Sequence, residues 1–202
     1  QYLEKDKGFA QSAIDQIDKL TDDVLDHLFN PWVDNIKIDK KGLVVGQVQS
    51  GKTANYSGLI CKAADAGFNF IVVLAGIHNN LRSQTQNRLD EGFLGFDTLF
   101  ARRADAGQSN KIGVGLIPGF KNAIANSITT SAEKGDFTKK AADTLGINFD
   151  TPSPILLVIK KNVSVMERVI TWLQSVSPDK QIDSKALLVI DDEADNASIN
   201  TK

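Results

Sequence analysis

The chain has 202 residues, of which 42% are hydrophobic and 24% charged, and its formal net charge is −2. This is the composition of a folded domain, so disorder is not expected, and no overall positive field exists to attract nucleic acid. One cysteine excludes an internal disulfide framework and fits a reducing, cytoplasmic compartment. No apolar run approaches the roughly 20 residues that cross a bilayer, so we expect no membrane contact.

The first forty residues are predicted to form an N-terminal helical extension. Apolar residues recur at helical spacing from Ile14 to Leu28, and Asn30-Pro31 ends the pattern. The first residue is not methionine and the last residues fall within a motif, so we expect a fragment of a longer protein.

From residue 41 to residue 202, short β-rich runs alternate with helical stretches. The predicted strands are Leu43–Val45, Phe70–Leu74, Lys111–Ile117, Ile155–Ile159 and Leu187–Ile190. Unbroken apolar strands separated by helices indicate an α/β fold with a mainly parallel sheet and helices on both faces. Residues 127–150 are polar and dotted with glycine, and we interpret them as an insertion.

Residues 46–53 match the phosphate-binding pattern G-x-x-x-x-G-K-[ST] in full. Its glycines let the backbone point several N–H groups at one anion, and the following helix adds its N-terminal partial charge. We expect Lys52 to reach the β- and γ-phosphates of ATP, and the Thr53 hydroxyl to bind Mg²⁺. The predicted nucleotide-binding residues are Gly46, Gln47, Gln49, Ser50, Gly51, Lys52, Thr53 and Ala54.

A cluster of acids follows the last predicted strand. Leu187–Ile190 leads directly into Asp191, Asp192, Glu193 and, two residues later, Asp195. Parallel sheets bind ligands at the carboxyl ends of their strands. We assign Asp192 to Mg²⁺ through water, with Asp191 as its rival, and Glu193 to the general base. A solvated acidic turn is the alternative interpretation.

With Gly-Lys-Thr in the loop and Asp-Glu-Ala-Asp at 192–195, the chain resembles the first RecA-like domain of a superfamily 2 helicase or translocase. It is similar, over about residues 40–202, to the bacterial endonuclease Z-one domain family. The matching stretches are residues 46–56, 74–86, 159–162 and 190–198.

The resemblance implies a RecA-like P-loop ATPase that uses ATP and Mg²⁺, in a restriction or anti-phage defence system. It also implies a GHKL-type ATPase and a nuclease or methylase as partners, and DNA as the molecule acted on. A second RecA-like domain with an arginine finger would complete the motor, so we expect this chain alone to hydrolyse ATP weakly. The preference for ATP over GTP is likewise implied by the family, and no Asn-Lys-x-Asp guanine motif is present.

In the helicases that the chain resembles, the segment corresponding to residues 76–88 touches the nucleic-acid backbone. The candidate phosphate contacts are Asn79, Asn80, Arg82, Ser83, Gln84 and Arg88, with Lys160 and Lys161 as a second basic patch. The alternative is an ordinary polar helix start with solvated arginines.

Three functions are compatible with these motifs. The first is a DNA-dependent ATPase motor domain. The second is a nucleotide-gated switch that recruits a nuclease or a GHKL ATPase partner. The third, an endonuclease in its own right, is disfavoured because no nuclease motif is visible.

Overall fold

The computed structural model describes residues 2–33, 38–45, 51–101, 110–119, 125–146, 153–176 and 185–194. Four strands form one sheet in the order β2-β3-β1-β4, and all three strand pairings are parallel. The strands are β1 (Phe68–Leu74), β2 (Asn126–Ser127), β3 (Ile155–Ile159) and β4 (Ala186–Asp191). The α-helices are α1 (Gln11–Asp26), α2 (Lys52–Ala66), α3 (Asn79–Leu89), α4 (Thr98–Ala101), α5 (Lys139–Leu145) and α6 (Val163–Val176). Shorter helical turns are η1 (Tyr2–Asp6), η2 (Asp90–Leu94) and η3 (Gly113–Leu116). The predicted α/β class with a parallel sheet is confirmed.

Strand β1 divides its side chains between two hydrophobic cores. Ile71 and Val73 belong to one core, and Phe70 and Val72 belong to the other, as the two-residue period of a strand requires. The pairing with β4 shifts between Phe68 and Phe70, which places Phe68 in the same core as Ile71. Because both faces are covered, the strand is an unbroken apolar run from Phe70 to Leu74.

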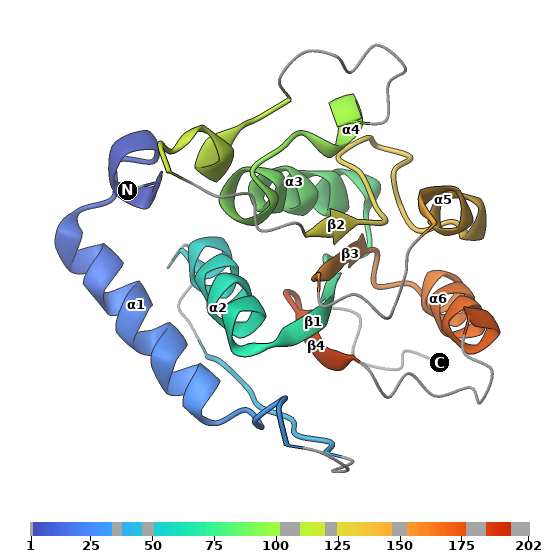
Figure 1. Ribbon diagram of the computed structural model, residues 1–202, viewed down its shortest axis with the longest axis horizontal. Coiled ribbons are helices and arrows are strands. Elements are labelled where there is room, and N and C mark those ends of the chain that lie inside the picture. Colours follow the sequence, from blue (N-terminus) through green and yellow to red (C-terminus); the bar gives the residue numbers. More distant parts are fainter. Residues whose placement is uncertain are drawn as a thin grey trace.

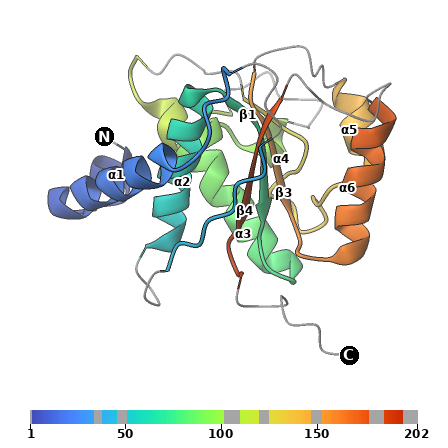
Figure 2. The ribbon, with the colours of Figure 1, turned by 90° about the horizontal axis from the view of Figure 1, so that it is seen from below.

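Helices cover both faces of the sheet. Helices α2 and α3 lie on one face, and α5 and α6 lie on the other (Figure 1). The first core includes Ile60 of α2 and Leu89 of α3, and the second includes Val169 and Trp172 of α6. Seen from below, the strands run between these two helical layers (Figure 2). Among the described residues, no helix combines the length and the apolar character that crossing a bilayer requires.

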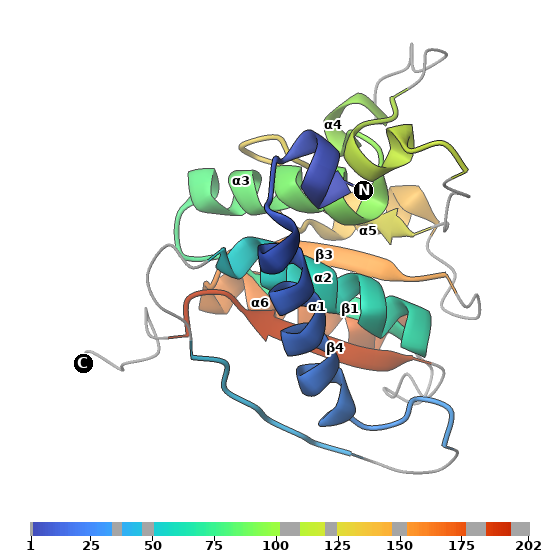
Figure 3. The same cartoon turned by 90° about the vertical axis from the view of Figure 1, so that its left-hand side faces the viewer.

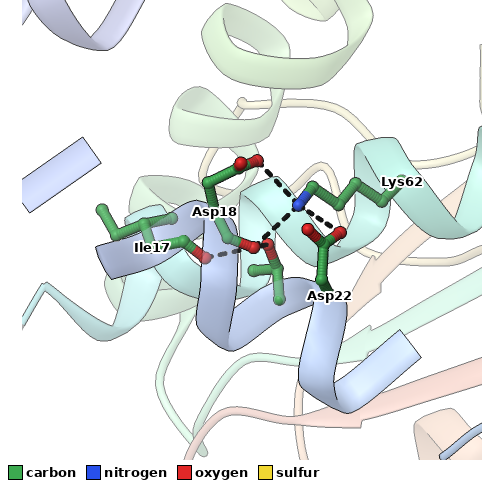
Figure 4. Close-up of polar contacts among 5 residues, drawn as sticks. Ile17, Asp18, Asp22 and Lys62 are labelled. Carbon is green, nitrogen blue, oxygen red and sulfur yellow. Dashed lines mark hydrogen bonds and ion pairs between the residues drawn. The ribbon is translucent and has the colours of Figure 1, made fainter. Parts of the chain in front are cut away.

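Helix α1 forms an additional layer on the outer side of α2 (Figure 3). Gly58 of α2 faces Ile17 and Thr21 of α1, since a Cβ atom added to it would lie in van der Waals contact with both side chains, at 3.5 Å. Lys62 of α2 forms ion pairs with Asp18 and Asp22 of α1, at 2.7 Å and 2.5 Å (Figure 4). Apolar packing and charge together hold the N-terminal helix on the domain.

The predicted strand at Leu43–Val45 is wrong. Residues 38–45 have no regular secondary structure, and the side chains of Leu43, Val44 and Val45 are between 65% and 85% exposed. A strand is stable only when its backbone groups pair with a neighbour, and no described segment pairs with this run.

The predicted strand at Lys111–Ile117 is also wrong. Lys111 makes a single antiparallel bridge to Phe96, and the chain then turns into η3. A Cβ atom added to Gly115 would lie 1.9 Å from the Gly95 carbonyl oxygen. The glycines therefore serve a close backbone contact, and the segment packs as a tight turn rather than extending.

The segment that we interpreted as an insertion contributes to the sheet and to the core where the structure describes it. Ser127 belongs to β2 and is in register with Leu156 of β3. Ile128 and Phe137 are completely buried. The Thr138 side chain accepts a hydrogen bond at the start of α5 and so caps this helix. Isolated apolar residues in a polar sequence therefore carry the packing of this segment.

A buried polar network joins α3, η2 and the chain after β2. The Gln86 side-chain amide donates to Asp90 (2.9 Å) and to Ser127 (3.2 Å), and it accepts from the Thr129 hydroxyl (2.7 Å). The Thr98 hydroxyl donates to Asp90 at 2.6 Å. Burial raises the pKa of Asp90 to about 6, although these hydrogen bonds lower it.

Candidate functional site

The carboxyl ends of three strands and the start of one helix meet at the same edge of the sheet. Leu74, at the end of β1, is in register with Ile159 of β3 and with Asp191 of β4. The first turn of α2 lies at this edge as well (Figure 3). In parallel α/β folds this edge is where ligands bind.

The described part of the phosphate-binding motif has the backbone that the motif requires. Gly51 has φ of 73°, a left-handed conformation that glycine adopts without strain, and helix α2 begins at Lys52. No side chain among the described residues caps this helix, and the first N–H groups of a helix are donors that an anion can accept from. The Lys52 side chain is exposed, and Thr53 and Ala54 follow in the first turn. The predicted residues Gly46, Gln47, Gln49 and Ser50 lie outside the described residues.

The structure brings Asp192 next to the first turns of α2. The Tyr56 hydroxyl donates to Asp192 Oδ2 at 3.2 Å, and the Asp192 backbone N–H donates to the Leu74 carbonyl at 3.1 Å. Burial raises the pKa of Asp192 above its ordinary value, whereas the Tyr56 hydrogen bond and the charges of Arg88 and Lys52 lower it. The predicted metal carboxylate and the predicted phosphate lysine are therefore electrostatic neighbours.

Tyr56 is a site residue that the sequence analysis missed. It lies three residues after Thr53, so both side chains occupy the same side of α2. Burial raises the pKa of the Tyr56 hydroxyl to about 12, which keeps it protonated and able to donate to Asp192. The signal that could have revealed it is this helical spacing from the motif threonine.

Glu193 and Asp191 are held by the turns that follow β1 and β3. A Cβ atom added to Gly76 would lie 3.3 Å from Glu193 Oε2, so the carboxylate packs over a glycine that has φ of 68°. The Lys161 ammonium forms an ion pair with Asp191 at 2.9 Å and donates to the Glu193 carbonyl oxygen at 2.9 Å. Lys161 also donates its backbone N–H to the Gly76 carbonyl at 2.7 Å. One lysine thus joins the ends of all three strands. The predicted Asp195 lies outside the described residues.

The prediction that Lys161 contacts nucleic acid is contradicted by this geometry. Its side chain is only 11% exposed, and its charge is directed at Asp191. Its neighbour Lys160 lies 4.0 Å from Asp136 with 26% of its side chain exposed. Lys161 therefore holds the acidic turn of the protein itself, whereas contact between Lys160 and nucleic acid stays a prediction.

Arg82 is the clearest correction to the predicted nucleic-acid contacts. Its side chain is completely buried, and its guanidinium donates to the Thr130 carbonyl at 2.8 Å and to the Ala132 carbonyl. The neighbouring Ser83 hydroxyl donates to the Ser131 carbonyl at 2.5 Å. Both side chains fasten α3 to residues 130–132. The burial of Arg82 excludes it as a phosphate contact, whereas contact between the half-buried Ser83 and a phosphate stays a prediction. Helix α3 has a mostly polar sequence, so nothing in the sequence indicated that Arg82 is buried.

The remaining candidates lie on α3 where solvent reaches them. Asn80, Gln84 and Arg88 are exposed and recur every four residues, and the half-buried Asn79 begins the helix. Side chains at this spacing share one side of a helix. Contact between this strip and a nucleic-acid backbone stays a prediction.

Arg88 has a second neighbour that the sequence did not indicate. Its Nη1 donates to the Thr53 Oγ1 atom at 2.8 Å. The C-terminal turn of α3 thereby places a cation beside the hydroxyl that we assign to Mg²⁺. Arg88 is separated from Thr53 by 35 residues, so only the packing of α3 beside α2 brings them together.

The donor set at this edge fits a magnesium nucleotide. Mg²⁺ prefers oxygen ligands and binds through one or two carboxylates together with phosphates and water. The Thr53 hydroxyl and the Asp192 carboxylate, both near the Tyr56 hydroxyl, supply such oxygens. Within the described ranges, no group of three or more His, Cys, Asp or Glu residues is arranged to hold a metal ion by itself. A metal here would therefore depend on phosphate oxygens.

Comparisons with protein-family models, with curated proteins and with solved structures found no match for this chain.

Proposed function

We propose that this chain is a RecA-like P-loop ATPase domain, the first motor domain of a superfamily 2 type of ATPase that acts on DNA. One observation carries the proposal. The hydrogen bond from Tyr56 to Asp192 joins the helix of the phosphate motif to the acidic turn, across 136 residues of sequence. Two motifs that a nucleoside triphosphatase needs thus meet at the ligand-binding edge of a parallel sheet.

Each residue of the site has a chemical role that its surroundings support. Lys52 and the N–H groups at the start of α2 neutralise phosphate charge. Thr53 and Asp192 would hold Mg²⁺, which when bound offsets the charge of the phosphate oxygens. The Glu193 carboxylate, packed over Gly76, takes a proton from the attacking water as general base.

The resemblance to the endonuclease Z-one domain family supports a place in restriction or anti-phage defence. By the same resemblance, its partners are a GHKL-type ATPase and a nuclease or methylase, and a second RecA-like domain completes the motor. These assignments go beyond the geometry of the site and are part of the proposal.

The experiment that tests the proposal measures ATP turnover with and without single-stranded or duplex DNA. We expect slow turnover in the wild type that DNA stimulates, and none in Lys52→Ala or Glu193→Gln. Lys139→Ala is the matched control, because Lys139 is also an exposed lysine at the first position of a helix. Turnover that survives Lys52→Ala would refute the ATPase assignment. Turnover that requires Lys52 but ignores DNA would refute the motor and favour the nucleotide-gated switch.

A further inference from the structure

Arg88 lies in the part of the proposed nucleotide site that would bind the divalent cation. Its guanidinium donates to Thr53 Oγ1 at 2.8 Å, and its positive charge interacts with the Asp192 carboxylate. Thr53 and Asp192 are the two side chains to which the proposed function assigns the divalent cation. In the structure, a protein cation therefore occupies the surroundings that the metal would need.

Helix α3 is anchored by a buried side chain, whereas the Arg88 side chain is exposed. The completely buried Arg82 ties the helix to the carbonyl groups of Thr130 and Ala132. Arg88, less than two turns further on, is exposed to solvent. An arginine on a flexible stem can change rotamer at little cost, so a ligand can displace the guanidinium without moving the helix.

We propose that Arg88 is an internal counter-cation, which occupies the divalent-cation position in the absence of nucleotide and must leave when a metal–nucleotide complex binds. The inference builds on the proposed function of this site. Two cations cannot share one position beside Thr53 and Asp192, because their repulsion adds to the loss of the hydrogen bond. Arg88 thus makes metal binding conditional on its own displacement and lowers the affinity for metal–nucleotide relative to nucleotide alone.

The test compares the affinity for ADP with Mn²⁺ and the affinity for ADP in EDTA, by calorimetry, and follows bound Mn²⁺ by electron paramagnetic resonance. Neither measurement depends on turnover. Arg88→Gln keeps a hydrogen-bonding side chain and removes the charge. We expect it to bind Mn²⁺–ADP roughly 3- to 10-fold more tightly than the wild type, with no gain for ADP in EDTA.

Arg168→Gln is the matched control, since Arg168 is an exposed arginine on α6, on the opposite face of the sheet, and its replacement should change neither affinity. Circular dichroism verifies that each variant is folded. A weaker affinity of Arg88→Gln for Mn²⁺–ADP would overturn the inference, because Arg88 would then be a phosphate ligand.

The outcomes separate this inference from the proposed function. If Mn²⁺–ADP binds equally to the wild type and to Arg88→Gln, and Lys52→Ala abolishes binding, the counter-cation role is refuted and the nucleotide site stands. If neither protein binds ADP or Mn²⁺–ADP, both are refuted. Binding that appears only in Arg88→Gln supports both.

Discussion

Replacing Arg82 tests whether this residue anchors α3 or contacts nucleic acid. Loss of an anchor lowers the free energy of unfolding, whereas loss of a phosphate contact weakens DNA binding. The guanidinium is completely buried and donates to the carbonyl groups of Thr130 and Ala132. A hydrogen bond from a charged donor contributes about 1.5–3 kcal/mol. Truncation to alanine also leaves the buried Thr130 carbonyl without this donor, so we expect Arg82→Ala to lower the free energy of unfolding by about 3–5 kcal/mol.

The measurement is urea denaturation followed by circular dichroism, with Arg168→Ala as the control. Arg168 is exposed, so its loss should change the free energy of unfolding by less than about 0.5 kcal/mol. Arg82→Lys keeps the charge but loses the planar fork, and we expect an intermediate loss of about 1.5–3 kcal/mol. A loss below about 1 kcal/mol in Arg82→Ala, together with weaker DNA binding, would refute the structural role.

Three further predictions concern the buried carboxylate and the acidic turn. Because burial raises the pKa of Asp90 to about 6 from 3.8, the folded state retains a proton between these values that the unfolded state has lost. The free energy of unfolding should therefore fall by up to about 3 kcal/mol as the pH rises through this window. In urea denaturation at several pH values, Asp90→Asn should remove this dependence on pH. If the dependence is unchanged in Asp90→Asn, Asp90 is not its source. Gly76→Ala adds a methyl group against Leu81 and Glu193 at a positive φ, so thermal denaturation should show a loss of about 2 kcal/mol. Gly146→Ala, at a positive φ in open space, should lose less, and equal losses would argue against these contacts. Lys161→Met removes the ion pair with Asp191 at the acidic turn, so ATP turnover should fall at least tenfold while ATP affinity changes little. Unchanged turnover would show that the acidic turn keeps its conformation without this lysine.

The sequence predicted the elements whose signal is local. The apolar runs of β1 and β3 indicate buried parallel strands, because the residues of such a strand face covered sides in alternation. The run of β4 also predicts a strand, although Leu187 and Val189 are about half exposed among the described residues. The glycine motif and the acidic cluster could be recognised as two parts of a candidate site, since each part is contiguous in the chain. Helix α2 begins at Lys52 as the motif requires.

The sequence could not predict features that arise only when distant segments meet. Strand β2 has two residues and exists because β3 is beside it. The sequence around Arg82 does not indicate whether its side chain is exposed to solvent or buried against residues 130–132. The contact between Arg88 and Thr53 depends on the packing of α3 beside α2, which no periodicity encodes.

The central claim is that Lys52 and the acidic turn form one nucleotide site, and calorimetry with ATP and Mg²⁺ tests it most directly. The wild type and Lys139→Ala should bind ATP with one site per chain. Lys52→Ala should bind at least tenfold more weakly, because it loses the cation that faces the phosphates. Equal affinity in Lys52→Ala and the wild type would contradict the account.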